Sequence, residues 1–178
     1  MKAFFVAAFF CLGLSGSLSA HPSHMGRISG TDVDLKTIGH GISGSVGDRL
    51  ILGRKLLGAF ESELRVLEHD QETVSRFFTD ESGVFGGSLN LGSGEGARQH
   101  SVKFVSLRRD ANMFEMSFDG EIAEVLVTSE GFENHHFINP EYSLNFRGKS
   151  YSFKMEDGQA CYGYSVHLIT MIFGSLIF

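Results

Sequence analysis

The alternation of apolar and polar residues in the second half of the chain limits its possible folds more than any other feature. Beyond Asp80, short runs of this kind are separated by segments rich in glycine and other turn-forming residues. A period of two places the apolar side chains on one face of a β-strand, and the pattern predicts about six or seven strands. The runs are Val84–Leu91, Val102–Leu107, Met113–Phe118, Ile122–Thr128, Tyr142–Phe146, Tyr151–Met155 and Tyr162–Ile172.

Two turn signals indicate that neighbouring strands are antiparallel. Tyr142–Phe146 and Tyr151–Met155 flank a short segment containing Gly148, which permits a tight hairpin turn. Asp119-Gly120 marks a second tight turn between two apolar runs. Since no strand-helix-strand alternation follows residue 80, a parallel sheet is disfavoured.

The segment Asp48–Phe78 has a different period. Its apolar residues recur at intervals of three and four, which is typical of a helix with one apolar face. They are Leu50, Leu57, Phe60, Leu64, Leu67, Val74 and Phe78. The sequence therefore predicts an α+β fold, in which an amphipathic helix over Asp48–Phe78 packs on an antiparallel sheet that can curl into a partial barrel. The largely apolar Val166–Phe178 is predicted to be a buried final strand.

Residues 1–20 have the pattern of a cleavable secretory signal. Lys2 precedes an apolar run, Ala3–Leu14, which is followed by small residues up to Ala20. The run is too short to span a bilayer comfortably. We therefore expect cleavage after Ala20 and a secreted, extracellular protein, with an uncleaved N-terminal anchor as the alternative.

The rest of the chain divides into an arm and one domain. Residues 21–47 are polar and glycine-rich, which predicts a flexible arm with one edge strand at Thr31–Ile38. Residues 48–178 are expected to form a single α+β domain. Cys11 leaves with the signal, so only Cys161 remains, and we predict a buried free thiol with an intermolecular disulfide as the alternative.

The charge balance argues against several kinds of partner. The chain has 15 lysines and arginines against 21 aspartates and glutamates, and its basic residues are not clustered. Phosphate groups are bound by clustered positive charges, so nucleic-acid binding and steady attachment to anionic lipid are disfavoured.

Motifs for catalysis and cofactor binding are weak. Gly39–Gly44 matches G-x-G-x-x-G but lacks the flanking strand-helix-strand unit, so we interpret it as a flexible loop. Ser43 and Ser45 do not complete a G-x-S-x-G nucleophile motif. His135 and His136 would point to opposite faces of a strand and could not readily share a metal ion. The sequence therefore assigns no catalytic residue and no cofactor.

His21 is a candidate metal ligand because signal cleavage would make it the N-terminal residue. Its amine and imidazole could then chelate copper together with a second histidine. This position resembles the N-terminal histidine of the copper-dependent polysaccharide monooxygenases. The resemblance covers this single residue, and it implies a copper site in a secreted enzyme.

The leading functional hypothesis is a secreted, non-catalytic interaction protein of the small effector type that host-associated microbes export. It rests on the signal, the single domain and the weak catalytic motifs, and it predicts a host protein as the partner. One alternative is an extracellular β-barrel that binds a small apolar ligand, lined by some of the 17 phenylalanines. The other is a secreted enzyme, including one with copper at His21.

Overall fold

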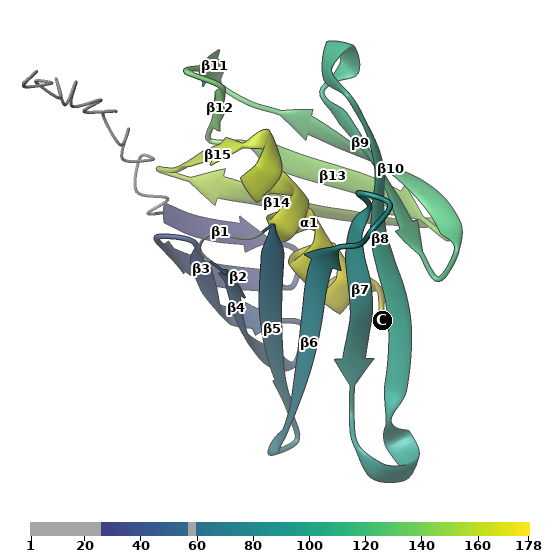
Figure 1. The fold of residues 1–178 in the computed structure, drawn as a ribbon. Helices are drawn as coiled ribbons and strands as arrows, with labels where there is room; N and C mark the ends of the chain where they lie inside the picture. Colours follow the sequence, from purple (N-terminus) through teal and green to yellow (C-terminus); the bar gives the residue numbers. More distant parts are fainter. Residues whose placement is uncertain (1–25, 57–59) are drawn as a thin grey trace, which may run out of the picture.

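Strands account for most of the chain, and they close into a barrel around a helix. The computed structural model describes residues 26–56 and 60–178. Within these ranges, twelve antiparallel strands form a closed barrel, three short strands form a second sheet, and one α-helix runs through the barrel (Figure 1). The prediction of an α+β fold with an N-terminal helix is therefore wrong.

The barrel strands follow one another around the wall in chain order, and the pairing of the first strand, β1, with the last, β14, closes the barrel. They are β1 (Gly26–Gly30), β2 (Val33–Ile38), β3 (Gly41–Val46), β4 (Arg49–Lys55), β5 (Glu61–Glu68), β6 (Gln71–Thr79), β7 (Phe85–Leu91), β8 (Arg98–Arg108), β9 (Met113–Phe118), β10 (Glu121–Thr128), β13 (Glu141–Phe146) and β14 (Lys149–Glu156). The second sheet contains β11 (Gly131–Glu133), β12 (His136–Ile138) and β15 (Gln159–Cys161), and two short 3-10 helices lie at Gly94–Gly96 and Arg109–Ala111.

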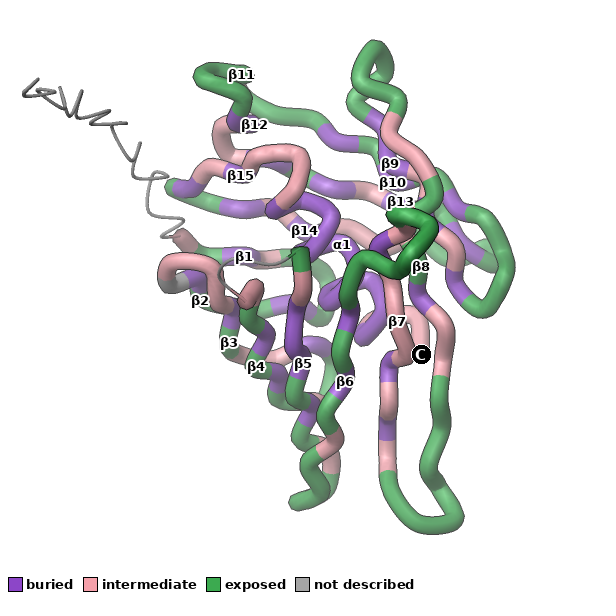
Figure 2. Tube along the Cα trace, in the orientation of Figure 1, coloured by how far each residue is buried: buried purple, intermediate pink, exposed green. Residues whose placement is uncertain are grey.

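Side chains alternate between the barrel interior and its outer surface. In β10, Ala123, Val125 and Val127 are buried, whereas the residues between them are exposed. The same alternation of buried and exposed positions continues along many of the strands (Figure 2). It follows from the period of two in the β-strand, which the sequence shows clearly beyond residue 80.

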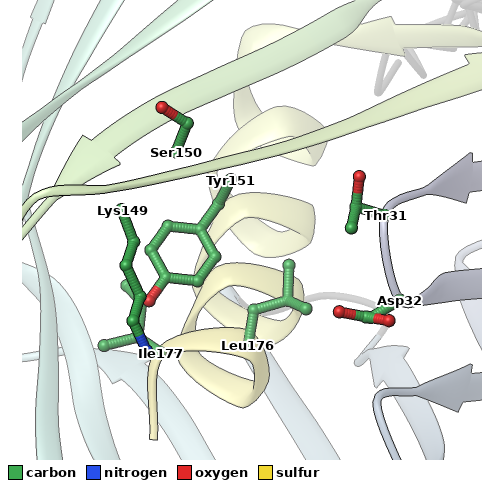
Figure 3. Close-up of a pocket in the computed structure, with 7 residues that line it drawn as sticks. All are labelled: Thr31, Asp32, Lys149, Ser150, Tyr151, Leu176 and Ile177. Atoms are coloured by element: carbon green, nitrogen blue, oxygen red, sulfur yellow. The ribbon is translucent and has the colours of Figure 1, made fainter.

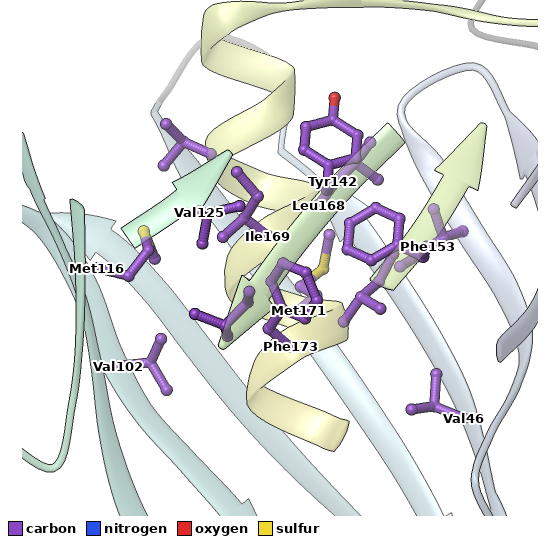
Figure 4. Packing of buried hydrophobic residues seen from close by; sticks show 14 of the residues in the cluster. Val46, Val102, Met116, Val125, Tyr142, Phe153, Leu168, Ile169, Met171 and Phe173 are labelled. Carbon is purple, nitrogen blue, oxygen red and sulfur yellow. The ribbon is translucent and has the colours of Figure 1, made fainter. Parts of the chain in front are cut away.

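The helix α1 (Tyr162–Ile177) occupies the interior of the barrel, where a buried final strand is predicted from the sequence. All its residues from Tyr164 to Ser175 are buried, and its side chains pack against those of strands around the wall (Figure 4). A helix surrounded on all sides has no polar face, so it lacks the periodic signal of an amphipathic helix. Cys161 caps its N-terminus, where the Sγ accepts a hydrogen bond from the Tyr164 N–H at 3.4 Å.

In the described ranges, no helix is both long and apolar enough to cross a membrane.

Residues 48–78, predicted as a helix, form β4, β5 and β6 and the turns between the strands in the described part of this segment. Their apolar residues lie on both faces of the sheet. Leu64 and Phe77 are fully buried inside, whereas Leu50 and Phe78 point outward and are more than half exposed. Because both faces carry large apolar residues, the expected alternation is hidden and an apparent step of three or four residues takes its place.

Part of the predicted flexible arm also belongs to the barrel wall. Residues 26–46 form β1, β2 and β3, and β2 pairs on both sides rather than lying at an edge. The glycines permit close approach of neighbouring backbones here. A Cβ atom at Gly30 would lie 2.4 Å from the Ser152 carbonyl oxygen, and one at Gly44 would lie 2.2 Å from that of Asp34.

The two hairpins indicated by the sequence are confirmed. β13 pairs with β14, with Tyr142 opposite Phe153 and Leu144 opposite Tyr151, and β14 begins two residues earlier than predicted, at Lys149. The turn between them places Arg147 and Gly148 at positive φ. β9 likewise pairs with β10 through the Asp119-Gly120 turn.

Candidate functional site

The outer surface of β4, β5 and β6 carries a group of exposed apolar side chains. We define the β4–β6 face by five of them, Leu50, Leu52, Leu67, Val74 and Phe78, whose exposed fractions range from 38% to 56%. The strand register brings several together, since Leu50 lies opposite Leu67, and Arg65 lies between Leu52 and Val74. Single exposed apolar residues are common on proteins, whereas several on adjacent strands make a candidate site of interaction.

A buried carboxylate lies beside these residues under three arginines. Glu63, whose side chain is 7% exposed, forms ion pairs with Arg54 at 3.1 Å, Arg65 at 3.2 Å and Arg76 at 3.8 Å. The hydrogen bond from Arg65, together with the charges of all three arginines, lowers the pKa of Glu63. Arg65 also contacts Glu72 at 3.1 Å.

The three guanidinium groups remain accessible to a partner. Their side chains are 44–67% exposed, and their three positive charges exceed the two negative charges of Glu63 and Glu72. The β4–β6 face therefore combines apolar surface with outward-facing N–H donors. This combination suits a partner that presents apolar side chains next to a carboxylate.

A surface pocket of about 450 Å³ lies at the end of the barrel near the C-terminus of α1. Its walls come from the β1–β2 turn and from the start of β14, and its floor comes from the last turn of α1 (Figure 3). The lining residues are Thr31, Asp32, Lys149, Ser150, Tyr151, Leu176 and Ile177.

Inside the barrel, Ser62 of β5 forms a hydrogen bond with His167 of α1 through the Oγ and Nδ1 atoms. Both residues are fully buried, and the rings of Phe60 and Phe85 lie 4.6 Å and 4.7 Å from the imidazole. Burial, with smaller contributions from the charges of Lys55 and His40, lowers the pKa of His167 to about 3.

This pair has the atoms of a nucleophile and its base, but its position indicates a structural role. A neutral imidazole can accept the serine proton, yet neither side chain has any exposed surface for a substrate to contact. The contact instead joins the barrel wall to the helix. Sequence reasoning missed it because the two residues are 105 positions apart, with no local motif around either.

A second histidine, His100, contacts the C-terminal end of α1 and also forms a hydrogen bond with Asp119. Asp119 accepts hydrogen bonds from the His100 ring at 2.8 Å and from the Ser101 N–H at 2.7 Å. Although burial raises the pKa of Asp119, these hydrogen bonds outweigh it and leave the pKa lowered. The Phe178 ring stacks on His100 at 3.8 Å, and Arg49 donates to the Ser175 carbonyl oxygen at 3.0 Å.

The structure does not bring the weak sequence motifs together into a site. Gly39–Gly44 spans a turn and the start of β3, without the helix that a dinucleotide-binding turn would need. His135 lies in a turn at positive φ, and His136 begins β12. Among the described residues, no three metal-ligating side chains form a cluster. His21, the predicted copper ligand, lies outside the described residues.

The predicted buried thiol at Cys161 is free, but it is only partly buried. Its structural role is the helix cap described above.

Comparison of the chain with family models, with curated proteins and with solved structures finds no match in any of the three.

Proposed function

We propose that this protein is a secreted, non-catalytic interaction protein that binds another protein through the β4–β6 face. The partner presents apolar side chains to Leu52 and Val74 and a carboxylate to the neighbouring arginines. We further propose that it belongs to the small effector type that host-associated microbes export, with a host protein as the partner. The signal pattern of residues 1–20 supports the secreted location.

The observation that carries this proposal is the exposure of large apolar side chains at neighbouring positions of β4, β5 and β6. Side chains of this kind lose contact with water when a partner covers them, which favours association. The arginines restrict the orientation in which the partner binds, because hydrogen bonds to a carboxylate require a defined position of the partner.

The interior of the barrel gives no comparable support to binding of a small apolar ligand. Helix α1 fills it with residues such as Leu168, Ile169 and Phe173, each of which is fully buried (Figure 4). An apolar ligand would have to displace these side chains from well-packed contacts.

The proposal is tested by removing apolar surface from the face without altering the interior. The double variant Leu52→Ser, Val74→Ser changes two outward side chains that are 52% and 41% exposed. We expect the unmodified protein to capture a reproducible protein partner from a host or medium extract, and this variant to lose it. Quantitative mass spectrometry of the captured material is the measurement.

A matched control is available on the opposite part of the barrel wall. The double variant Ile122→Ser, Leu126→Ser removes two outward side chains of β10 that are 59% and 48% exposed. It should retain the partner. Equal capture by both variants, or no reproducible partner for the unmodified protein, would contradict the proposal.

A further inference from the structure

The pocket at the end of the barrel exists because two neighbouring strands differ in length there. β1 ends at Gly30, opposite Phe153 of β14, whereas β14 begins at Lys149 and so extends four residues beyond this point. The barrel wall therefore has a step at this end. The start of β14 lies on one side of the step, and the β1–β2 turn lies on the other. The resulting pocket has a volume of about 450 Å³, within the range of about 300–1,000 Å³ that is common for small-molecule sites.

Opposite charges line the two walls of this pocket. Lys149 and Tyr151 share the face of β14 that carries the buried Phe153, and so they point toward the end of α1. Asp32 lines the opposite wall, at a turn position with a φ of 61°. Figure 3 shows the Lys149 ammonium beside the Tyr151 hydroxyl on one side of the pocket and the Asp32 carboxylate on the other.

Both charged groups are available to a ligand. Neither the Lys149 ammonium nor the Asp32 carboxylate forms an ion pair or a hydrogen bond with any residue in ranges 26–56 and 60–178. Other charged side chains of the barrel wall do have partners, as Arg147 has in Glu121 and Lys154 in Glu130. An ammonium and a carboxylate that share a pocket without contacting each other are complementary to a molecule that carries both charges.

The floor between the two charges is apolar. Leu176 and Ile177 of α1 lie there with part of their side chains accessible, and Figure 3 shows Leu176 between Asp32 and Lys149. The C-terminal end of a helix also carries partial negative charge, which favours a cationic group near it. The pocket thus offers an acceptor for an amine, a donor for a carboxylate and apolar contacts between them.

We propose that this pocket binds a small zwitterion of the α-amino-acid class with an apolar side chain. The ligand amine pairs with Asp32, its carboxylate pairs with Lys149 and the Tyr151 hydroxyl, and its side chain rests on Leu176 and Ile177. This site is separate from the β4–β6 face, and it is independent of the function proposed above.

Isothermal titration of the purified protein with three related probes tests the proposal. L-Leucine carries both charges, L-leucinamide lacks the carboxylate, and 4-methylpentanoate lacks the amine. We expect leucine to bind at least about tenfold more tightly than either analogue, because each analogue leaves one charged group of the pocket unpaired. A leucine affinity no greater than that of the analogues, or no leucine binding at millimolar concentration, would overturn the proposal.

Two exposed substitutions assign each charge to its ligand group. Lys149→Gln should abolish the preference for leucine over leucinamide, and Asp32→Asn should abolish the preference for leucine over 4-methylpentanoate. Asparagine tolerates the left-handed backbone conformation at position 32, so the turn is preserved. Lys36→Gln and Asp48→Asn make the same charge changes at exposed positions outside the pocket, and they should leave both preferences intact. Unchanged preferences in the two pocket variants would also refute the proposal.

Discussion

At Gly53 in β4, the lack of a side chain allows α1 to lie close to the barrel wall. A Cβ atom at this position would lie 2.5 Å from the Met171 sulfur and 2.9 Å from the Ile42 Cγ1 atom. Both distances are shorter than side chains tolerate, and both neighbours are buried. The glycine therefore sets the distance between the helix and this strand.

We expect Gly53→Ala to lower the free energy of unfolding by about 1–3 kcal/mol, because the added methyl group overpacks the contact between β4 and α1. Urea unfolding followed by circular dichroism measures the change. Gly96→Ala is the control, since a Cβ atom there would have no neighbour within 4 Å. Equal stability of the two variants would show that Met171 moves aside without cost.

Among the elements, α1 is connected to the wall by polar contacts as well as by apolar packing. Ser62 bonds to His167, and Tyr142 bonds to Ser165 at 2.8 Å. These contacts fix the rotation of a helix whose apolar surface alone is nearly uniform. Hydrogen bonds inside a barrel have this directing effect because an unpaired polar group there is costly.

The burial of His167 makes the free energy of unfolding of the protein dependent on pH. Its pKa is about 3 in the folded protein, against the ordinary value of 6.5, so the unfolded chain binds the proton more tightly. The neutral His167 therefore makes its full contribution to the free energy of unfolding above pH 6.5. This contribution is lost progressively as the pH falls from 6.5 toward 3. The expected slope is about 1.4 kcal/mol per pH unit in this window.

The variant His167→Asn isolates this effect, because asparagine keeps a polar group near Ser62 but does not titrate. Urea unfolding at several values between pH 7.5 and pH 4 should show a shallower loss of stability in the variant than in the unmodified protein. The other titrating groups are common to both proteins and cancel in the comparison. Parallel pH profiles would contradict a buried neutral His167.

At the scale of the whole molecule, closure of the barrel joins distant parts of the chain. β1 pairs with β14, so Ile28 lies opposite Met155. The helix follows in sequence and is enclosed by strands from both ends of the chain. The wall and the helix therefore depend on each other, because the barrel without α1 would lack much of its interior packing.

This dependence predicts a single cooperative unfolding transition. Far-ultraviolet circular dichroism reports on the strands, and near-ultraviolet dichroism reports on buried tyrosines such as Tyr142, which contacts α1. The two signals should have the same thermal midpoint. An earlier loss of the tyrosine signal would mean that the helix leaves the barrel while the wall remains folded.

Beyond residue 80, the six barrel strands β7 to β10, β13 and β14 could be predicted because one face of each is largely apolar and the other largely polar. The β13–β14 hairpin, for example, follows from its alternating residues and from Gly148. The short strands β11, β12 and β15 were missed, and Tyr162–Ile172, predicted as a strand, belongs to α1. Prediction failed at β4, β5 and β6, where Leu50 and Phe78 are apolar although they point outward and are more than half exposed. The same property that misled the secondary-structure prediction is the basis of the proposed interaction surface.

By itself, the sequence determined the alternating barrel strands beyond residue 80, their antiparallel hairpin turns and the absence of strong catalytic motifs, since these depend on local residue patterns. Only the tertiary structure decided that the wall closes, that α1 lies inside it, and that Ser62 meets His167. It also decided that Asp32 and Lys149 line one pocket. The physical reason is that these features depend on contacts between residues more than 100 positions apart, which no local period or motif encodes.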